Sequence, residues 1–148
     1  MTIAVSTGLR DAMLNATGLK GALDGGEIRI YSGTPPSSAD DAISGDATVL
    51  VTILTDVAGG LTFDAPVSGT IAKAAAETWS SDVAVTGTAT WYRHVANGDL
   101  DNASTTAPRI QGDVSTAGAA LNLSSVALVA SSPQTIDYYT IGLPTLTM

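Results

Sequence analysis

Cysteine is absent from this chain of 148 residues, and charged residues are scarce. Without cysteine there can be no disulfide framework, no thiolate nucleophile and no zinc site with cysteine ligands. Charged residues make up only 14% of the sequence, against about 25% in typical soluble domains. The surface polarity must therefore come mainly from serine, threonine, asparagine and glycine, a composition that favours strands and turns over helices.

Basic residues are few and isolated. The chain has six lysines and arginines against fourteen acidic residues, which gives a net charge of −8. No basic stripe is present that could follow a phosphate backbone, so we expect no direct binding to nucleic acid. The acidic balance favours repulsion between free copies, which keeps an abundant protein in solution.

Long apolar runs are also missing. The N-terminal segment lacks the basic region of a secretion signal. No stretch approaches the roughly 20 apolar residues of a membrane span. We therefore expect a chain that is made in the cytoplasm, stays soluble and does not enter a membrane.

The pattern of apolar residues predicts one short helix followed by strands. Residues 6–17 show helical spacing with a serine or threonine cap at the start, and after Gly26 the period changes to two. We expect about seven to nine strands in a single β-rich domain over 1–148, with a long loop over 33–47. Evenly spaced turn signals favour an antiparallel β-sandwich or barrel. These signals are Gly25-Gly26, Gly59-Gly60, Asn97-Gly98, Ala117-Gly118 and Ser132-Pro133.

The segment TVLVTIL, residues 48–54, is apolar on both faces of a strand. A strand of this kind must be covered on both sides, by a core and by something else. The sequence does not say whether the second cover is the chain itself or a partner.

Few residues could support catalysis. The one histidine, His94, has no nucleophile in a G-x-S-x-G context, and we interpret it as a half-buried strand residue beside two aromatics. Asp40 and Asp41 lie next to each other in a loop that does not hold two carboxyls at a fixed separation, so we interpret them as a solvated loop tip. We expect that the protein is not an enzyme. We also expect no cofactor, because the sequence contains no G-x-G-x-x-G or P-loop motif.

The segment NGDLDN, residues 97–102, begins like a calcium loop with oxygen ligands at alternate positions. Asn102 stands where such a loop needs glycine, and Pro108 stands where it needs a bidentate glutamate. The better interpretation is a hairpin connection in which Asn97-Gly98 supplies positive φ values. We therefore predict no metal site.

Three aromatic residues could form a platform for sugar binding: Trp79, Trp91 and Tyr92. Aromatic residues at strand spacing are more often core or subunit contacts. A carbohydrate-binding appendage domain remains the alternative function of another class.

Both ends of the chain are apolar: the segment MTIAV at the start and the segment TIGLPTLTM at the end. A free terminus on a soluble monomer is usually polar and frayed. With the doubly apolar segment 48–54, this indicates more apolar surface than one core needs, and predicts self-assembly. The residues expected to make the contacts are Leu50, Leu54, Trp91, Tyr139, Leu143, Leu146 and Met148.

The order of several segments resembles a group of small structural proteins of tailed bacteriophages. The similarity runs nearly from end to end and contains no catalytic signature. The segments that carry it are residues 8–42, 61–81, 87–96, 105–114 and 135–144. The resemblance implies a virion structural protein that is assembled in the host cytoplasm.

Two stations in the virion fit a β domain with apolar ends. One is a capsid decoration, or cement, protein, which the resemblance implies to be a homo-oligomer, typically a trimer, bound to the major capsid protein. The other is a neck or tail component such as a connector, tube or collar subunit, in which the 33–47 loop could join neighbouring rings. The low-charge, thiol-free composition, rich in threonine and serine, suits many identical passive contacts and favours the decoration protein.

The 33–47 loop is then expected to be a contact or surface element. Its prolines reduce the entropy lost on docking. On this interpretation, deletion of residues 35–44 leaves the fold intact and weakens incorporation into particles.

Overall fold

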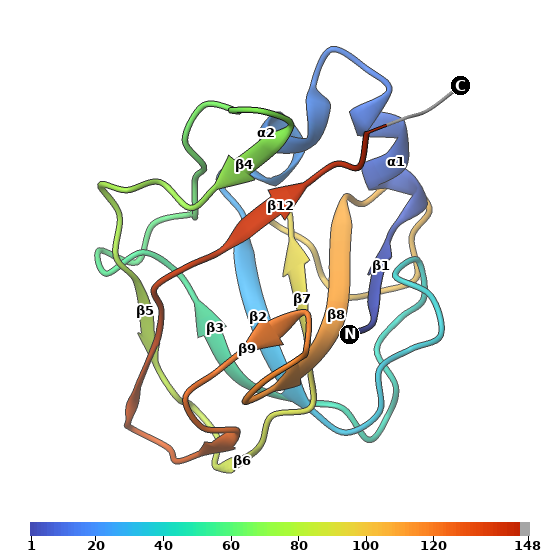
Figure 1. The fold of residues 1–148 in the computed structure, drawn as a ribbon. Coiled ribbons are helices and arrows are strands. Elements are labelled where there is room, and N and C mark those ends of the chain that lie inside the picture. The colour runs from blue at the N-terminus through green and yellow to red at the C-terminus, as the bar shows by residue number, and fades with distance from the viewer. Residues whose placement is uncertain (146–148) are drawn as a thin grey trace.

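A mainly antiparallel sheet forms the centre of the molecule, as a computed structural model that describes residues 1–145 shows (Figure 1). Strands account for 37% of the chain and helices for 9%, so the expected mainly β fold is confirmed. The strands are β1 (Ile3–Val5), β2 (Glu27–Ser32), β3 (Thr48–Ile53), β4 (Thr70–Ala72), β5 (Trp79–Asp82), β6 (Gly87–Thr88), β7 (Trp91–Val95), β8 (Arg109–Ser115), β9 (Leu121–Asn122), β10 (Ala127–Leu128), β11 (Pro133–Ile136) and β12 (Thr140–Gly142).

The main sheet has the order β1-β8-β7-β2-β3, with β9 added in parallel to β8. The remaining strands form three two-stranded ribbons, β10-β6, β11-β5 and β12-β4. Twelve strands exceed the seven to nine expected, because several contain only two or three residues. Strands that short carry too little alternation to be recognised in a sequence.

The helix expected over 6–17 is shorter, α1 (Thr7–Met13), and a second helix that was not expected follows it, α2 (Gly18–Leu23). Ser6 caps α1, and its Oγ accepts a hydrogen bond of 3.1 Å from the Leu9 backbone N–H. The exposed Leu14 is the C-cap of α1, and Gly18 has a positive φ between the two helices.

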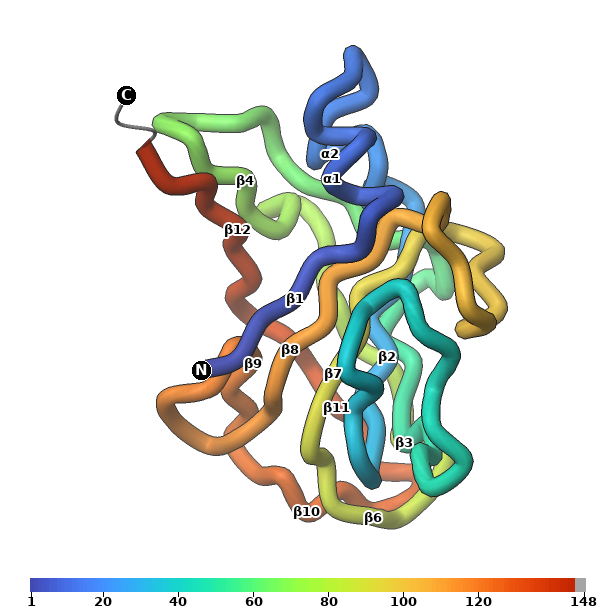
Figure 2. The backbone as a smooth tube through the Cα atoms, turned by 90° about the vertical axis from the view of Figure 1, so that its right-hand side faces the viewer, coloured from blue at the N-terminus to red at the C-terminus, as the bar shows by residue number. Residues whose placement is uncertain are grey.

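The register of the main sheet divides its residues between two chemically different faces. Across β2, β7 and β8, the row Ile28–His94–Ile110 faces the hydrophobic core. The next row, Arg29–Arg93–Gln111, faces the other side. Figure 2 shows that β12 and β4 lie on one side of the sheet, while the 33–47 loop (cyan to teal) lies on the other.

The ribbons cover the apolar face, and the core lies between them and the sheet. As expected, the doubly apolar segment 48–54 is covered on both sides. Both covers belong to the chain itself. The Leu50 carbonyl accepts a hydrogen bond of 2.8 Å from the Ala84 N–H, and a Cβ at Gly87 would lie 2.8 Å from the Leu50 side chain.

His94 lies in this core and is fully buried, not half-buried as expected. Its ring stacks on Phe63 at 5.6 Å, and its Nδ1 lies 3.3 Å from the Tyr139 hydroxyl. Burial lowers the pKa of His94 to about 3, because the Leu23 carbonyl and the charge of Asp24 only partly offset the lost hydration of the charged ring. The imidazole is therefore neutral at pH 7 and serves as a packing group.

The pKa of His94 predicts a loss of stability as the pH falls. The unfolded chain takes up the His94 proton near pH 6.5, whereas the folded chain resists it until about pH 3. Between about pH 6.5 and pH 4.5 the free energy of unfolding should fall by about 2 to 3 kcal/mol. Urea denaturation at several pH values measures this slope.

The matched variant for this measurement is His94→Leu, which removes the titrating group and keeps an apolar filling. Its free energy of unfolding should be nearly flat over the same pH range, whatever its absolute value. An equal slope in the variant and the wild type would show that other groups cause the loss.

Candidate functional site

The second face of the main sheet carries a buried cluster of arginines and aspartates. Arg109 at the start of β8 binds Asp99 in a bidentate pair, with distances of 2.6 Å from Nε and 2.9 Å from Nη2. Each side chain is only 2% exposed. Burial by itself raises the pKa of Asp99, but the hydrogen bonds from Arg109 outweigh it and the pKa of this carboxyl is lowered.

Asp101 holds the other half of the cluster. Its carboxylate accepts hydrogen bonds from Arg29 Nη1 at 2.8 Å, from the Tyr31 hydroxyl at 2.6 Å and from Arg93 Nη1 at 3.3 Å. Burial lowers the pKa of Arg93, and the charge of Asp101 offsets part of this effect. Burial and the bond to Asp101 raise the pKa of Tyr31. Glu27 also pairs with Arg29, so the carboxylates of Glu27 and Asp101 balance the charges of Arg29 and Arg93.

The long 33–47 loop covers this cluster. The segment contains no strand, as expected, but it is not a free surface element. Its backbone carbonyls accept hydrogen bonds from buried side chains of β7 and β8. The pairs are Gln111 with Pro36 at 2.8 Å, Arg109 with Ala39 at 3.1 Å and Arg93 with Asp41 at 3.2 Å.

The adjacent carboxylates of the loop serve different local partners. Asp40 accepts hydrogen bonds from the Thr7 N–H at 2.7 Å and from its hydroxyl at 2.6 Å, which ties the loop to the start of α1. These two bonds lower the pKa of Asp40. Asp41 accepts from the Ser38 N–H at 3.1 Å. The interpretation of both as a solvated loop tip is therefore wrong for Asp40, which is part of a lock between loop and helix.

The segment 97–102 lies in the connection between the antiparallel strands β7 and β8, as expected for a hairpin. Gly98 has a φ of 83°, but the positive φ expected at Asn97 is wrong, and Asp101 has one instead, of 61°. The carboxylates that resembled calcium ligands, Asp99 and Asp101, are already neutralised by arginine. Within residues 1–145 no group of three or more His, Cys, Asp or Glu side chains converges as metal ligands do.

The three aromatic residues of the carbohydrate hypothesis do not form a platform. Trp79, Trp91 and Tyr92 are all buried. Trp91 stacks on Tyr31 with ring centroids 4.0 Å apart, beneath the arginine cluster. Trp79 contacts Phe63 and Tyr139 inside the core. None of these rings is available to stack on a sugar.

The residues expected to form contacts between subunits divide into three groups. Leu50, Trp91 and Tyr139 are buried in the chain's own interior. They were misplaced because the ribbons and the loop supply the second cover that a partner was expected to supply. Leu54 is half-buried and Leu143 is 54% exposed, so both remain accessible. Leu146 and Met148 lie outside the described residues.

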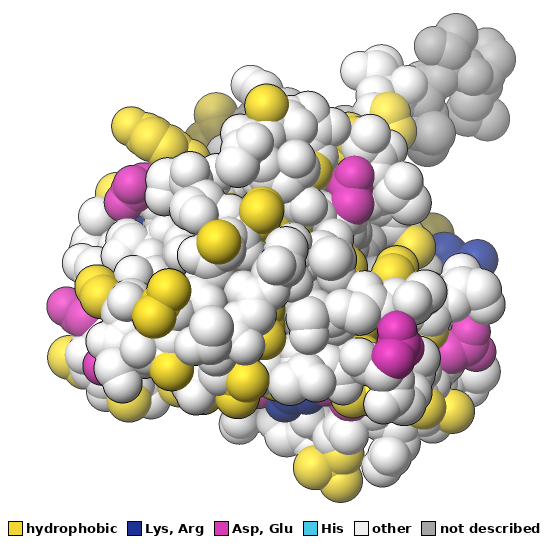
Figure 3. All heavy atoms as spheres, turned by 90° about the horizontal axis from the view of Figure 1, so that it is seen from below, with side chains coloured by type: hydrophobic (Ala, Val, Ile, Leu, Met, Phe, Trp, Pro, Cys, Tyr) yellow, Lys and Arg dark blue, Asp and Glu magenta, His cyan; other side chains and the backbone are white. Residues whose placement is uncertain are grey.

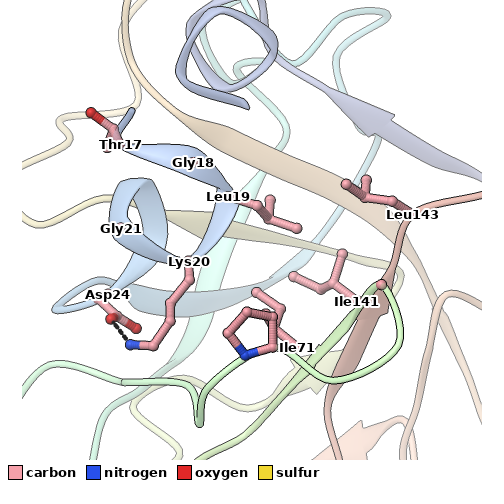
Figure 4. A pocket seen from close by; sticks show the side chains of 11 residues that line it. Thr17, Gly18, Leu19, Lys20, Gly21, Asp24, Ile71, Ile141 and Leu143 are labelled. Carbon is pink, nitrogen blue, oxygen red and sulfur yellow. Dashed lines mark hydrogen bonds and ion pairs between the residues drawn. The ribbon is translucent and has the colours of Figure 1, made fainter. Parts of the chain in front are cut away.

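Exposed apolar side chains occur at several separate places, including Leu14, Val57, Leu100 and Tyr138, and one concentration of them lies around β1 and β12. Ile3 is 53% exposed and Val5 38%, and the groove of about 270 Å³ between β1 and β12 is lined by Ile3 and Ile141. A second groove of about 500 Å³ lies between α2 and the β12-β4 ribbon, where Leu19, Ile71, Ile141 and Leu143 point toward one another (Figure 4). One sequence feature indicated this surface, the apolar segment MTIAV.

The opposite end of the molecule lacks such a concentration. Figure 3 shows hydrophobic side chains scattered over the lower end, with uncharged polar atoms between them and acidic side chains around them. Scattered exposed apolar residues are normal on a soluble protein and indicate no interface. The side that carries β1 and β12 is therefore the candidate functional surface.

Comparison with known protein families, with curated protein sequences and with solved structures gave no match for this chain. Neither helix in the described part of the chain is long and apolar enough to cross a membrane.

The buried pair predicts a large effect of one substitution. Arg109→Met should lower the free energy of unfolding by about 3 to 5 kcal/mol, because it leaves the buried Asp99 carboxylate without its counter-charge. Adding Asp99→Asn to this variant should recover part of the loss. The control Arg10→Met removes an exposed arginine of α1 and should change stability by about 0.5 kcal/mol or less. Equal effects of Arg109→Met and Arg10→Met in urea denaturation would contradict the role of the cluster.

The role of the loop as a cover predicts the opposite of the earlier expectation for its deletion. Removal of residues 35–44 takes three carbonyl acceptors from buried donors, each worth about 1 to 3 kcal/mol or more for charged donors. The deleted chain should therefore lose its cooperative thermal melt. The control Gly45→Ala, at an exposed loop position where an added Cβ meets no neighbouring atom, should melt nearly as the wild type does. A cooperative melt of the deleted chain would restore the view of the loop as a dispensable surface element.

Proposed function

We propose that this protein is a structural subunit of a tailed-bacteriophage virion, and specifically a decoration protein that binds the major capsid protein. Two things support the proposal. The order of sequence segments resembles small phage structural proteins nearly from end to end, and the fold is a small β domain with two accessible grooves beside β12 that apolar side chains line.

The chemistry of the titratable groups also favours a passive role. The imidazole of His94 is sealed in the core, and the carboxylates of Asp99 and Asp101 are paired with arginine. A general base must reach its substrate and titrate near the working pH, which His94 does not. Among residues 1–145, the groups with the most perturbed environments therefore serve the fold.

The conformation of the 33–47 loop favours a decoration protein over a neck or tail subunit. In the neck or tail hypothesis this loop extends from the subunit and joins neighbouring rings. In this structure it folds back on its own sheet and caps Arg93 and Arg109. A loop that is committed to the subunit's own stability does not serve as a bridge. This observation carries the choice between the two stations.

The proposed mechanism is mechanical. Apolar contacts bury surface at about 25 cal/mol per Å², and repetition over many identical sites multiplies a modest contact by avidity. A decoration protein of this kind stabilises a shell without any chemical step. Its requirements are a rigid subunit and an accessible apolar surface.

Copy number tests the proposal. In virions purified from a lysate that produces this protein, quantitative mass spectrometry should give a copy number in the hundreds, comparable to the major capsid protein. The purified protein should also bind shells that lack it. A copy number that fits a single ring would assign the protein to the neck, and absence from the particle would exclude a virion role.

A further inference from the structure

We propose that the free edge of β1 is a self-pairing interface, at which a second copy of this chain adds its own β1 in antiparallel orientation. The inference takes from the proposed function only that copies of the chain assemble. It names the surface and the register of one contact between them.

The hydrogen bonds of β1 leave two residues with unused backbone groups. Asp113 N–H donates to the Thr2 carbonyl at 3.1 Å, and Ser6 N–H donates to the Arg109 carbonyl at 3.0 Å. Bonding to β8 therefore falls on the even positions of β1, because successive residues of an antiparallel pair alternate between facing toward and away from the partner. The N–H and C=O groups of Ile3 and Val5 point away from the sheet.

No described segment covers this edge. β1 is the last strand of the main sheet on its side, and it runs along the outside of the molecule in Figure 2. It contains no charged residue and no proline, which are the usual means by which proteins protect an edge from pairing. The strand is thus both open and unprotected.

The opposite edge of the same sheet shows the contrast. On β3, the Leu50 carbonyl accepts from the Ala84 N–H at 2.8 Å, and beyond its end the Leu54 carbonyl accepts from the Ser80 N–H at 3.0 Å. The chain closes that edge with its own residues. Only the β1 side of the sheet is left to a partner.

The pattern of β1 is complementary to itself. A two-fold axis through Ala4 sets Ile3 of one copy opposite Val5 of the other, and their outward N–H and C=O groups then form two hydrogen-bonded pairs. The two Ala4 residues face each other in the closer, non-hydrogen-bonded position, which suits a small side chain. Directly opposite β-branched pairs such as Ile3 with Val5 stabilise antiparallel strands.

The pairing also accounts for the exposed side chains of β1. Ile3 and Val5 lie in the same rows as Tyr92 and His94, on the core face of the sheet. The second layer ends at β12 and leaves the groove of about 270 Å³ beside Ile3. Edge pairing keeps the faces of both sheets aligned, so the second copy brings its own Ile3 and Val5 to the mouth of this groove.

β12 also has an open edge, but this edge has less apolar side-chain area to bury against a second copy. Its bonds to β4 use the odd positions, since Lys73 N–H donates to the Tyr139 carbonyl and Leu143 N–H to the Gly69 carbonyl. The outward residues are Thr140 and Gly142, which carry little apolar area to bury. The β1 edge is therefore the better site for a second copy.

A single engineered cysteine tests the register. The natural chain has no cysteine, so Ala4→Cys has only its own counterpart to react with. Facing residues in a non-hydrogen-bonded antiparallel pair have Cα atoms about 4.5 Å apart, within disulfide range. Mild oxidation should convert most of the variant to a covalent dimer. The control Val57→Cys, at an exposed loop position, should cross-link only slowly. Equal cross-linking of the two variants would overturn the register.

A second pair of variants tests the interface without a new bond. The purified wild type should have the mass of two chains in light scattering at high concentration. Ile3→Lys with Val5→Lys should reduce it to one chain that still melts cooperatively, because like charges at the edge oppose pairing. The control Val57→Lys should keep the mass of two chains.

Each remaining outcome is decisive. A wild type that stays monomeric, a double variant that stays paired with a normal melt, or a mass of three chains would each overturn the β1 pair. A mass of three would instead match the trimer that the phage resemblance implies. Because these measurements use the purified chain alone, failure here leaves the copy number in the virion as a separate test of the proposed function.

Discussion

The cluster of Arg29, Arg93 and Arg109 with Asp99 and Asp101 is the constraint on which the rest of the structure depends. A central strand that places charges on its buried face must have those charges paired and their remaining donors satisfied, because an uncompensated buried charge costs several kcal/mol. Two connections meet this demand. The 96–108 connection supplies the carboxylates, and the 33–47 loop supplies the carbonyls. Segments without regular structure are thereby fixed as firmly as the strands.

The cluster also determines the charge of the surface. Three of the six basic residues are taken into the interior with their acidic partners Glu27, Asp99 and Asp101. Three basic and eleven acidic residues remain for the rest of the molecule, so its charge is almost entirely of one sign. Copies of such a molecule repel one another over most of their surface. Attractive contacts are left to places without charge, and β1, which contains no charged residue, is such a place.

The sequence predicted the features that depend on local patterns. The change of period at Gly26, the Ser6 cap and the absence of strands from 33–47 could all be read from neighbouring residues. It could not predict the pairs that cross the sheet, since Arg29 and Asp101 are 72 residues apart. The same lack of long-range information placed Leu50, Trp91 and Tyr139 at an interface. An apolar residue does not show in its sequence whether its cover is a ribbon of the same chain or another copy.

Backbone pairing is well suited to a molecule with this distribution of charge. The hydrogen bonds of a strand edge join neutral groups, so salt and pH act on them far less than on ion pairs between exposed side chains. Register also gives specificity, because a slip by one residue on β1 would turn its bonded groups toward β8 and its side chains to the wrong face. With three of its four arginines used to hold its own loops, the chain is therefore suited to the proposed recognition of a second copy through the main chain, and its acidic surface disfavours contacts between copies through other faces.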